Sequence, residues 1–249
     1  MENEISNSQY HCLTHSERRA AKRKSAYCRI GWIMLCLFGI VLIVAFCATW
    51  RKDGDFRSFR RVQTISNAKQ LHVAILDFAA DYGHFPDDRS AQNTPALIDF
   101  RGCYSNAYLG QLIADGYLKG EEVFYAFDER YRRKKPDDVI SPPEKILQKG
   151  ECGFGYVMVE EKGKVRGLSS KDDGGLPLLV APIVDASGVF EKKSLDGRGV
   201  YLRVDGSARN ERLQGDTAKL KVGPRTLFDT GTGTVWGTEL KPVILLPER

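Results

Sequence analysis

The hydrophobic pattern of the chain is dominated by one apolar stretch, which runs from Ile30 to Trp50. Its 21 residues carry no charge. At about 1.5 Å of rise per residue, a helix of this length matches a hydrocarbon core of roughly 30 Å. The pattern therefore predicts a transmembrane helix over residues 30–50. A cleaved signal peptide that ends near Ala45 and Cys47 is the alternative.

A second periodic segment follows the apolar stretch. Its apolar residues recur at intervals of three and four, which is typical of one stripe on an amphipathic helix. Gly83 and Pro86 are signals for the end of this helix. Residues 51–84 are therefore predicted to continue the span, giving a helix of up to 53 residues and roughly 80 Å. The predicted stripe consists of Phe56, Phe59, Val62, Ile65, Ala68, Leu71, Ile75, Phe78 and Tyr82.

Residues 85–249 are predicted to form a globular α+β domain. Thr94-Pro95 marks the start of a short helix, and a second helix is expected over residues 106–115. Asp205-Gly206 is a tight-turn signal for a hairpin, and the frequent Gly and Pro residues favour short antiparallel strands. The segment 226–247 is expected to cover the sheet. Strands are predicted at residues 122–127, 154–160, 178–184, 200–204, 208–213 and 218–222.

Charge separates the N-terminal segment from the rest. Residues 1–29 are polar with a charge of +3, and they are predicted to be a disordered cytoplasmic tail. The remaining residues carry 31 basic and 29 acidic groups, a balance that argues against bulk nucleic-acid binding. Six basic residues flank each side of the apolar stretch, so the positive-inside rule gives no orientation by itself.

The residues that carry chemistry form no recognisable catalytic motif. Only His72 and His84 follow the apolar stretch, and the zinc-protease, nucleophile-elbow and phosphate-loop motifs do not occur. The sequence therefore predicts a protein that is not an enzyme and has no organic cofactor. Carboxylate oxygens are ligands for calcium, so an acidic region gives one candidate metal site, with a solvated acidic face as the alternative. The calcium candidates are Asp77, Asp81, Asp87 and Asp88.

Two of the six cysteines lie in the predicted globular domain, at Cys103 and Cys152. They are candidates for one disulfide if the domain is extracytoplasmic. Two separate thiols are an equally weighted alternative.

Three segments, in the same order along the chain, resemble one family. They are residues 67–86 (NAKQLHVAILDFAADYGHFP), residues 108–124 (YLGQLIADGYLKGEEVF) and residues 199–206 (GVYLRVDG). The first is similar to the pattern that closes the long N-terminal helix of bacterial type II secretion pseudopilins and related type IV pilin-like proteins. The resemblance implies a pilin-like fold, in which the long helix packs on an antiparallel sheet.

The resemblance also implies a leader peptide that is cleaved after a glycine. Gly31 is the candidate leader-cleavage glycine of this chain. The family has glutamate at the fifth mature position, whereas this sequence has Cys36 and no glutamate in the apolar stretch. The difference favours a divergent subunit that keeps the anchor and is not processed as a major pilin.

Three functions follow from the sequence. The first is a pseudopilin-like, non-enzymatic structural component of a type II secretion or pilus-like system. Its partners are the lipid bilayer and other secretion subunits, and it lies in the bacterial inner membrane with an extracytoplasmic domain. The second is a membrane-anchored surface binding domain, and the third is a tethered enzyme.

Overall fold

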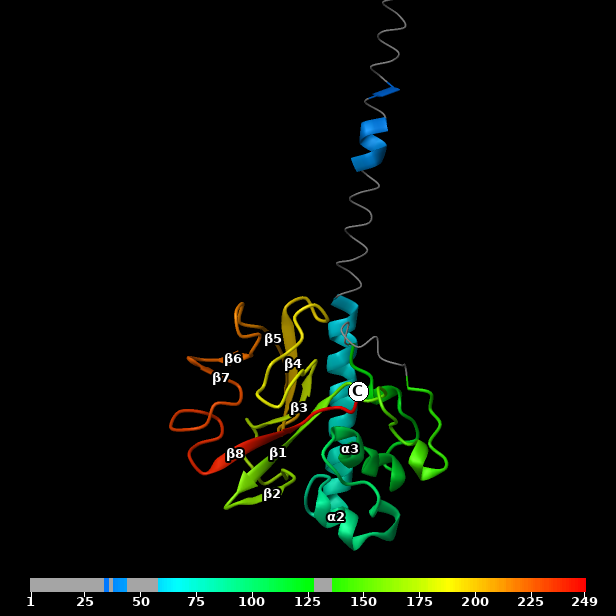
Figure 1. Cartoon of the computed structure of the whole chain (residues 1–249), viewed down its shortest axis with the longest axis vertical. Coiled ribbons are helices and arrows are strands. Elements are labelled where there is room, and N and C mark those ends of the chain that lie inside the picture. Colours follow the sequence, from blue (N-terminus) through cyan, green and yellow to red (C-terminus); the bar gives the residue numbers. More distant parts are fainter. Residues whose placement is uncertain (1–33, 36–37, 44–57, 128–135) are drawn as a thin grey trace, which may run out of the picture. The chain divides into compact units, whose positions relative to one another are not determined.

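The structure is a computed structural model that describes residues 34–35, 38–43, 58–127 and 136–249 (Figure 1). The chain divides into two compact units, Met1–Gly54 and Asp55–Arg249. The described residues of the second unit form an α+β domain with an antiparallel sheet. This is the class that the sequence predicts for that region.

The predicted membrane span is contradicted. Of residues 30–50, the structure describes only the short helical pieces 34–35 and 38–43. Within the described ranges, no helix is both long enough and apolar enough to cross a bilayer. The described helical residues 58–82 extend over about 38 Å and include charged residues throughout this length.

Several other predictions depend on the membrane span and are therefore wrong as well. The continuous helix from residue 30 to residue 82, the pilin-like fold built on it and the single-pass inner-membrane location are wrong as made, because each of them depends on that long apolar helix. The predicted cytoplasmic tail over residues 1–29 and the leader-cleavage glycine Gly31 lie outside the described residues.

Helix 58–82 forms where the periodicity predicts it. It ends at Gly83, whose φ of +76° is open to glycine and strained for other residues, and whose N–H donates to Ala79 O at 2.9 Å. The inner face of this helix belongs to the core of the domain. The fully or almost fully buried apolar residues of this inner face are Ala68, Leu71, Ala74, Ile75 and Phe78.

The predicted apolar stripe divides into two faces. Leu71, Ile75 and Phe78 are buried as expected, whereas the side chains of Phe59 and Val62 are each 62% exposed. The register of the helix accounts for this, because residues 59 and 62 point about 100° or more away from the centre of the buried face. The first turn of the helix therefore presents apolar residues that the domain does not cover.

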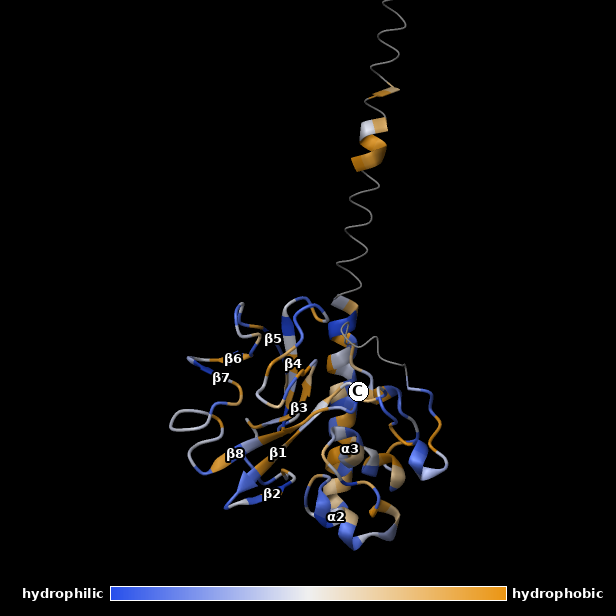
Figure 2. Ribbon diagram, viewed as in Figure 1, coloured by the Kyte–Doolittle hydropathy of each residue, from blue (hydrophilic) through white to orange (hydrophobic). Residues whose placement is uncertain are grey.

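The six-stranded sheet is antiparallel throughout, in the order β2-β1-β3-β4-β5, with β8 paired to β1. β1 and β3 are almost continuously buried, so they carry runs of apolar residues rather than alternating ones. In Figure 2 much of the ribbon of β1 and β3 has the orange colour of hydrophobic residues. The strands are β1 (Gly155–Glu161), β2 (Lys164–Arg166), β3 (Pro177–Ala181), β4 (Arg198–Arg203), β5 (Ala208–Arg212) and β8 (Leu240–Leu245).

The sequence predicts most, but not all, of these strands. The hairpin between β4 and β5 turns at Asp205-Gly206 as expected, with Gly206 at a φ of +79°. Residues 122–127 begin instead as the 3-10 helix η2 (Glu122–Phe124). The segment 226–247 does more than cover the sheet, because its end forms β8 within it. Residues 218–222 form two bridges and β6 (Lys221–Val222), which pairs with β7 (Arg225–Thr226).

Short helices connect helix 58–82 to the sheet. They are α2 (Asp88–Asn93), η1 (Pro95–Leu97), α3 (Ser105–Ala114), η2 and η3 (Pro143–Lys145). The start of α3 is fixed on β1 because Ser105 Oγ donates to Phe154 O at 2.7 Å. The segment after helix 58–82 is fixed in the same way, since the buried Tyr156 hydroxyl of β1 donates to Pro86 O at 2.9 Å.

We predict opposite outcomes for two neighbouring substitutions on helix 58–82. Ile75→Ala removes a fully buried side chain, so it should lower the free energy of unfolding by about 2–5 kcal/mol. Leu76→Ala is the matched control, because this side chain is 37% exposed, and it should cost less than about 1 kcal/mol. Urea denaturation of dilute protein measures both, and equal losses would contradict the assignment of the two faces.

Candidate functional site

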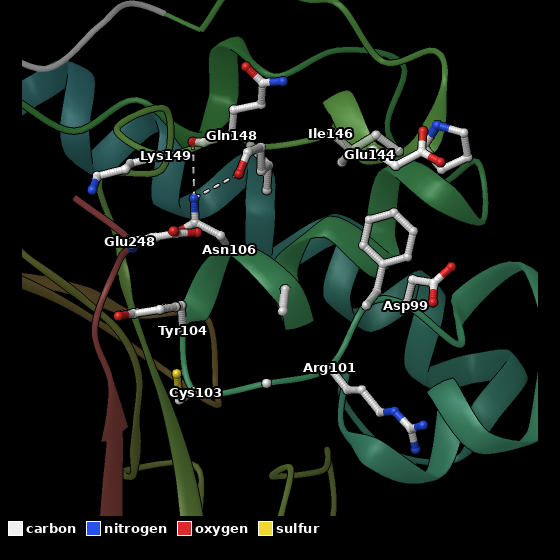
Figure 3. A pocket seen from close by; sticks show the side chains of 15 residues that line it. Asp99, Arg101, Cys103, Tyr104, Asn106, Glu144, Ile146, Gln148, Lys149 and Glu248 are labelled. Carbon is white, nitrogen blue, oxygen red and sulfur yellow. Dashed lines mark hydrogen bonds between the residues drawn. The ribbon is translucent and has the colours of Figure 1, made fainter.

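A cleft of about 680 Å³ opens beside the N-terminal half of α3 (Figure 3). Residues 99–107, 143–149 and the C-terminal Glu248 contribute to its walls. Its charged lining residues are Asp99, Arg101, Glu144, Lys149 and Glu248.

Asn106 holds the walls of this cleft together. Its Nδ2 donates to Leu147 O at 2.8 Å and to Gln148 O at 3.2 Å, and its Oδ1 accepts from the backbone N–H of Glu248 at 2.8 Å. One buried amide thus joins α3, the segment after η3 and the segment after β8. Because all three bonds go to backbone, Asn106 shapes the cleft and has little capacity left for a ligand.

The cleft offers few groups for catalysis. Cys103 is an exposed thiol in its lining, and none of the lining residues is a histidine. The two histidines of the domain lie elsewhere, His72 against Val204 O at 2.9 Å and His84 against Phe85 O at 3.0 Å. A thiol nucleophile requires a neighbouring base, and the described lining includes no histidine that could serve Cys103 in this way.

The predicted disulfide is not formed in this structure. Cys103 is exposed, Cys152 is fully buried, and neither forms a disulfide. Cys152 Sγ lies 3.8 Å from Ser105 Oγ, within the core near β1. The arrangement is therefore the alternative of two separate thiols.

The four aspartates proposed for calcium do not converge on one point. Asp87 is buried, caps α2, and accepts bonds from Arg89 Nε at 2.8 Å and from the Gly167 N–H at 3.0 Å. Asp88 accepts from the Tyr108 hydroxyl at 2.8 Å; burial and this bond raise the pKa of Tyr108 to about 12. The exposed Asp81 accepts from Tyr117.

A different set of carboxylates does come together. One oxygen from each of Glu121, Asp137 and Glu151 lies within 4.8 Å of the others. Glu121 is fully buried, and its oxygens accept from the backbone N–H groups of Leu147 at 2.6 Å and Asp138 at 3.2 Å. Burial raises the pKa of the Glu121 carboxyl above its usual value, with nearby Glu151 and Asp137 adding to the effect.

Local sequence carries no signal for this carboxylate cluster. Glu121 and Glu151 are separated by 30 positions, and only the return of the chain after η3 brings them together. The donors on Glu121 are backbone groups, which a sequence pattern does not assign to a side chain.

The outer face of helix 58–82 is a candidate interaction surface, which the prediction of one apolar stripe does not separate from the buried face. Residues 59, 62, 66, 69, 73, 76 and 80 are all exposed and lie within a sector of about 100°; we call them the outer stripe. Their spacing alternates between three and four residues, as in the a and d positions of a heptad repeat. Four of them are large apolar side chains, Phe59, Val62, Val73 and Leu76.

The outer stripe has two apolar ends and a polar centre. Phe59 and Val62 form one end, and Val73 and Leu76 form the other with Ala80. Ser66 and Lys69 lie between the two ends. A groove of about 530 Å³ borders the stripe near its N-terminal end, with Phe59, Gln63 and Gln70 on the helix side and Val123 and Phe127 opposite.

Comparison with known proteins assigns no relative to the chain. No protein-family model, no curated protein and no solved structure matches it.

We predict that Glu121 makes the free energy of unfolding decrease as the pH rises. A carboxyl whose pKa is raised on folding favours the folded state below its unfolded pKa, and this advantage is lost as the pH rises through the folded pKa. Glu121→Gln removes this titration. The stability of the variant relative to the native chain should therefore improve from pH 4 to pH 7, as measured by urea denaturation. Glu122→Gln is the control, and parallel pH profiles for Glu121→Gln and the native chain would contradict the assignment.

Proposed function

We propose that the protein is a non-catalytic, pseudopilin-like structural component of a type II secretion or pilus-like assembly. The observation that carries the proposal is the outer stripe of helix 58–82. The domain buries one face of this helix completely and leaves an apolar face of regular heptad spacing in solvent. Exposed apolar surface of this kind marks an interaction site.

The geometry of the stripe favours another helix as the occupant. Residues at a and d spacing insert between the side chains of a facing helix, and their 3.5-residue period keeps the seam on one side. A subunit of an assembly needs such a face in addition to a folded domain. The resemblance of residues 67–86 to the helix exit of pseudopilins supports the same function, because those residues include the second apolar end of the stripe.

The chemistry of the domain is consistent with a structural role. The buried polar groups described above, Asn106, Asp87 and Glu121, are bonded to backbone groups that fix connections between segments. Such bonds rigidify a scaffold, since a satisfied buried polar network specifies one arrangement of the chain.

A binding domain is a second candidate, favoured by the cleft beside α3. The cleft has a volume in the range of small-molecule pockets and carries both Arg101 and Lys149 on its rim. If the cleft binds a small ligand, Arg101→Ala should abolish retention of the protein on an array of candidate small ligands. Secretion should not change. Loss of secretion with retained binding would instead favour the structural role.

We predict that substitutions in the outer stripe disrupt assembly without unfolding the domain. Val73→Ser and Leu76→Ser, combined in the full chain in its native cells, should reduce co-purification with secretion-machine proteins and reduce secretion by about tenfold or more, since two apolar contacts are lost. The matched control is Val165→Ser, because Val165 is 51% exposed but lies on β2. Normal secretion by the double variant would contradict the proposed function.

A further inference from the structure

The outer stripe is complementary to itself when two helices run antiparallel. In this orientation Phe59 faces the partner's Leu76, and Val62 faces the partner's Val73. At the centre, Ser66 faces the partner's Lys69. Each of these contacts occurs twice, because a two-fold axis makes the same surface serve both subunits.

We propose that two copies of this chain pair through their outer stripes as an antiparallel helix dimer. This rests on the proposed function in one respect, namely that the stripe is the face offered to neighbouring subunits. The dimer covers that face before assembly, so that dimerisation and incorporation compete for the same residues.

The position of Lys69 disfavours a parallel dimer in which the two helices are in register. That arrangement places Lys69 opposite the partner's Lys69 at a d position, where two like charges face each other across the seam. In the antiparallel arrangement the Lys69 ammonium lies beside a serine hydroxyl, which accepts a hydrogen bond. The aliphatic part of the lysine side chain then covers apolar surface while its charge stays in water.

The short overlap between the two helices disfavours a parallel dimer in which the copies are shifted by 14 residues. A shift of 14 residues brings Val73 opposite the partner's Phe59 and Leu76 opposite the partner's Val62, but only about 11 of the described residues of each helix then overlap, roughly 17 Å. The antiparallel pair overlaps over residues 58–77, or about 30 Å, and covers all four large apolar side chains of both copies.

The inner face of the helix fixes where the two domains lie in the pair. The inner face of each helix is buried in its own domain, so the two domains lie on the outer sides of the helix pair. The contact involves two short helix faces, so the dimer should be weak and depend on concentration.

Photo-cross-linking tests the arrangement directly. A benzoylphenylalanine at position 66 of the full chain should react with residues 65–70 of the partner subunit, and one at position 62 should react with residues 72–74, as located by mass spectrometry. Adducts of the position-62 probe at residues 60–64 would indicate the parallel, in-register pair and would overturn the proposal. Adducts of the position-66 probe at residues 79–83 would overturn the antiparallel dimer and indicate the parallel stagger. Absence of any dimer adduct at the concentrations where the native chain sediments as a dimer would also overturn it.

Sedimentation equilibrium measures the strength of the contact. Val73→Ser should raise the Kd of the dimer by about tenfold or more, because the substitution removes one apolar group from each copy. Val165→Ser should leave the Kd unchanged, and circular dichroism should show both variants folded. A native chain that is monomeric over the whole concentration range would refute the inference.

The proposed dimer and the proposed role in secretion can be refuted independently of each other. If the purified chain is monomeric but stripe variants still lose secretion, the dimer is wrong and the structural role stands. If the dimer forms as described but stripe variants secrete normally, the dimer stands and the role in secretion is wrong.

Discussion

The domain depends on the burial of one face of helix 58–82 against the rest of the core. Leu71, Ile75 and Phe78 are fully buried and belong to the same apolar cluster as the central strands β1, β3 and β4. Burying three such side chains contributes about 1.5–3 kcal/mol each relative to solvent exposure, a large share of the net stability of a domain. The bonds of Asn67 to Tyr125 O and of His72 to Val204 O then fix the position of the helix between its flanking segments.

This constraint also leaves the outer stripe in solvent. A helix can bury only one side in its own domain, and the register that places Ile75 inside leaves Val73 and Leu76 outside. The apolar character of the outer side is not needed for the fold. We therefore attribute it to association with another helix.

The sequence predicts helix 58–82, α3 and the β4–β5 hairpin because each depends on local signals. Apolar spacing defines the helix, Gly83 and Gly116 mark helix ends, and Asp205-Gly206 defines the turn. The membrane helix was predicted from hydropathy alone, which reports the transfer of residues 30–50 into an apolar phase but not whether a single continuous helix forms. The described residues contain no such helix, so that prediction and the architecture built on it are withdrawn.

The remaining features depend on contacts between distant residues. β8 contains Pro242, which is a signal against a strand in the interior of a sheet, and its pairing with β1 is what makes it a strand. Asp87 resembled a metal ligand in sequence, but its bonds to Arg89 and Gly167 assign it to a structural role. The carboxylates of Glu121, Asp137 and Glu151 meet only after the chain has folded. Phe59 and Val62 fall in the predicted stripe because its residues follow one another in steps of three, and each such step shifts the face of an α-helix by 60°.

A serine scan of helix 58–82 with two readouts tests the central claim, that the two faces of this helix have different functions. Each variant of the full chain would be measured for its free energy of unfolding in dilute solution and for its self-association at high concentration. Substitutions at Leu71, Ile75 and Phe78 should lower the free energy of unfolding, whereas those at Val62, Val73 and Leu76 should weaken association at nearly unchanged stability. Stability and association that fall together at every position would contradict the account.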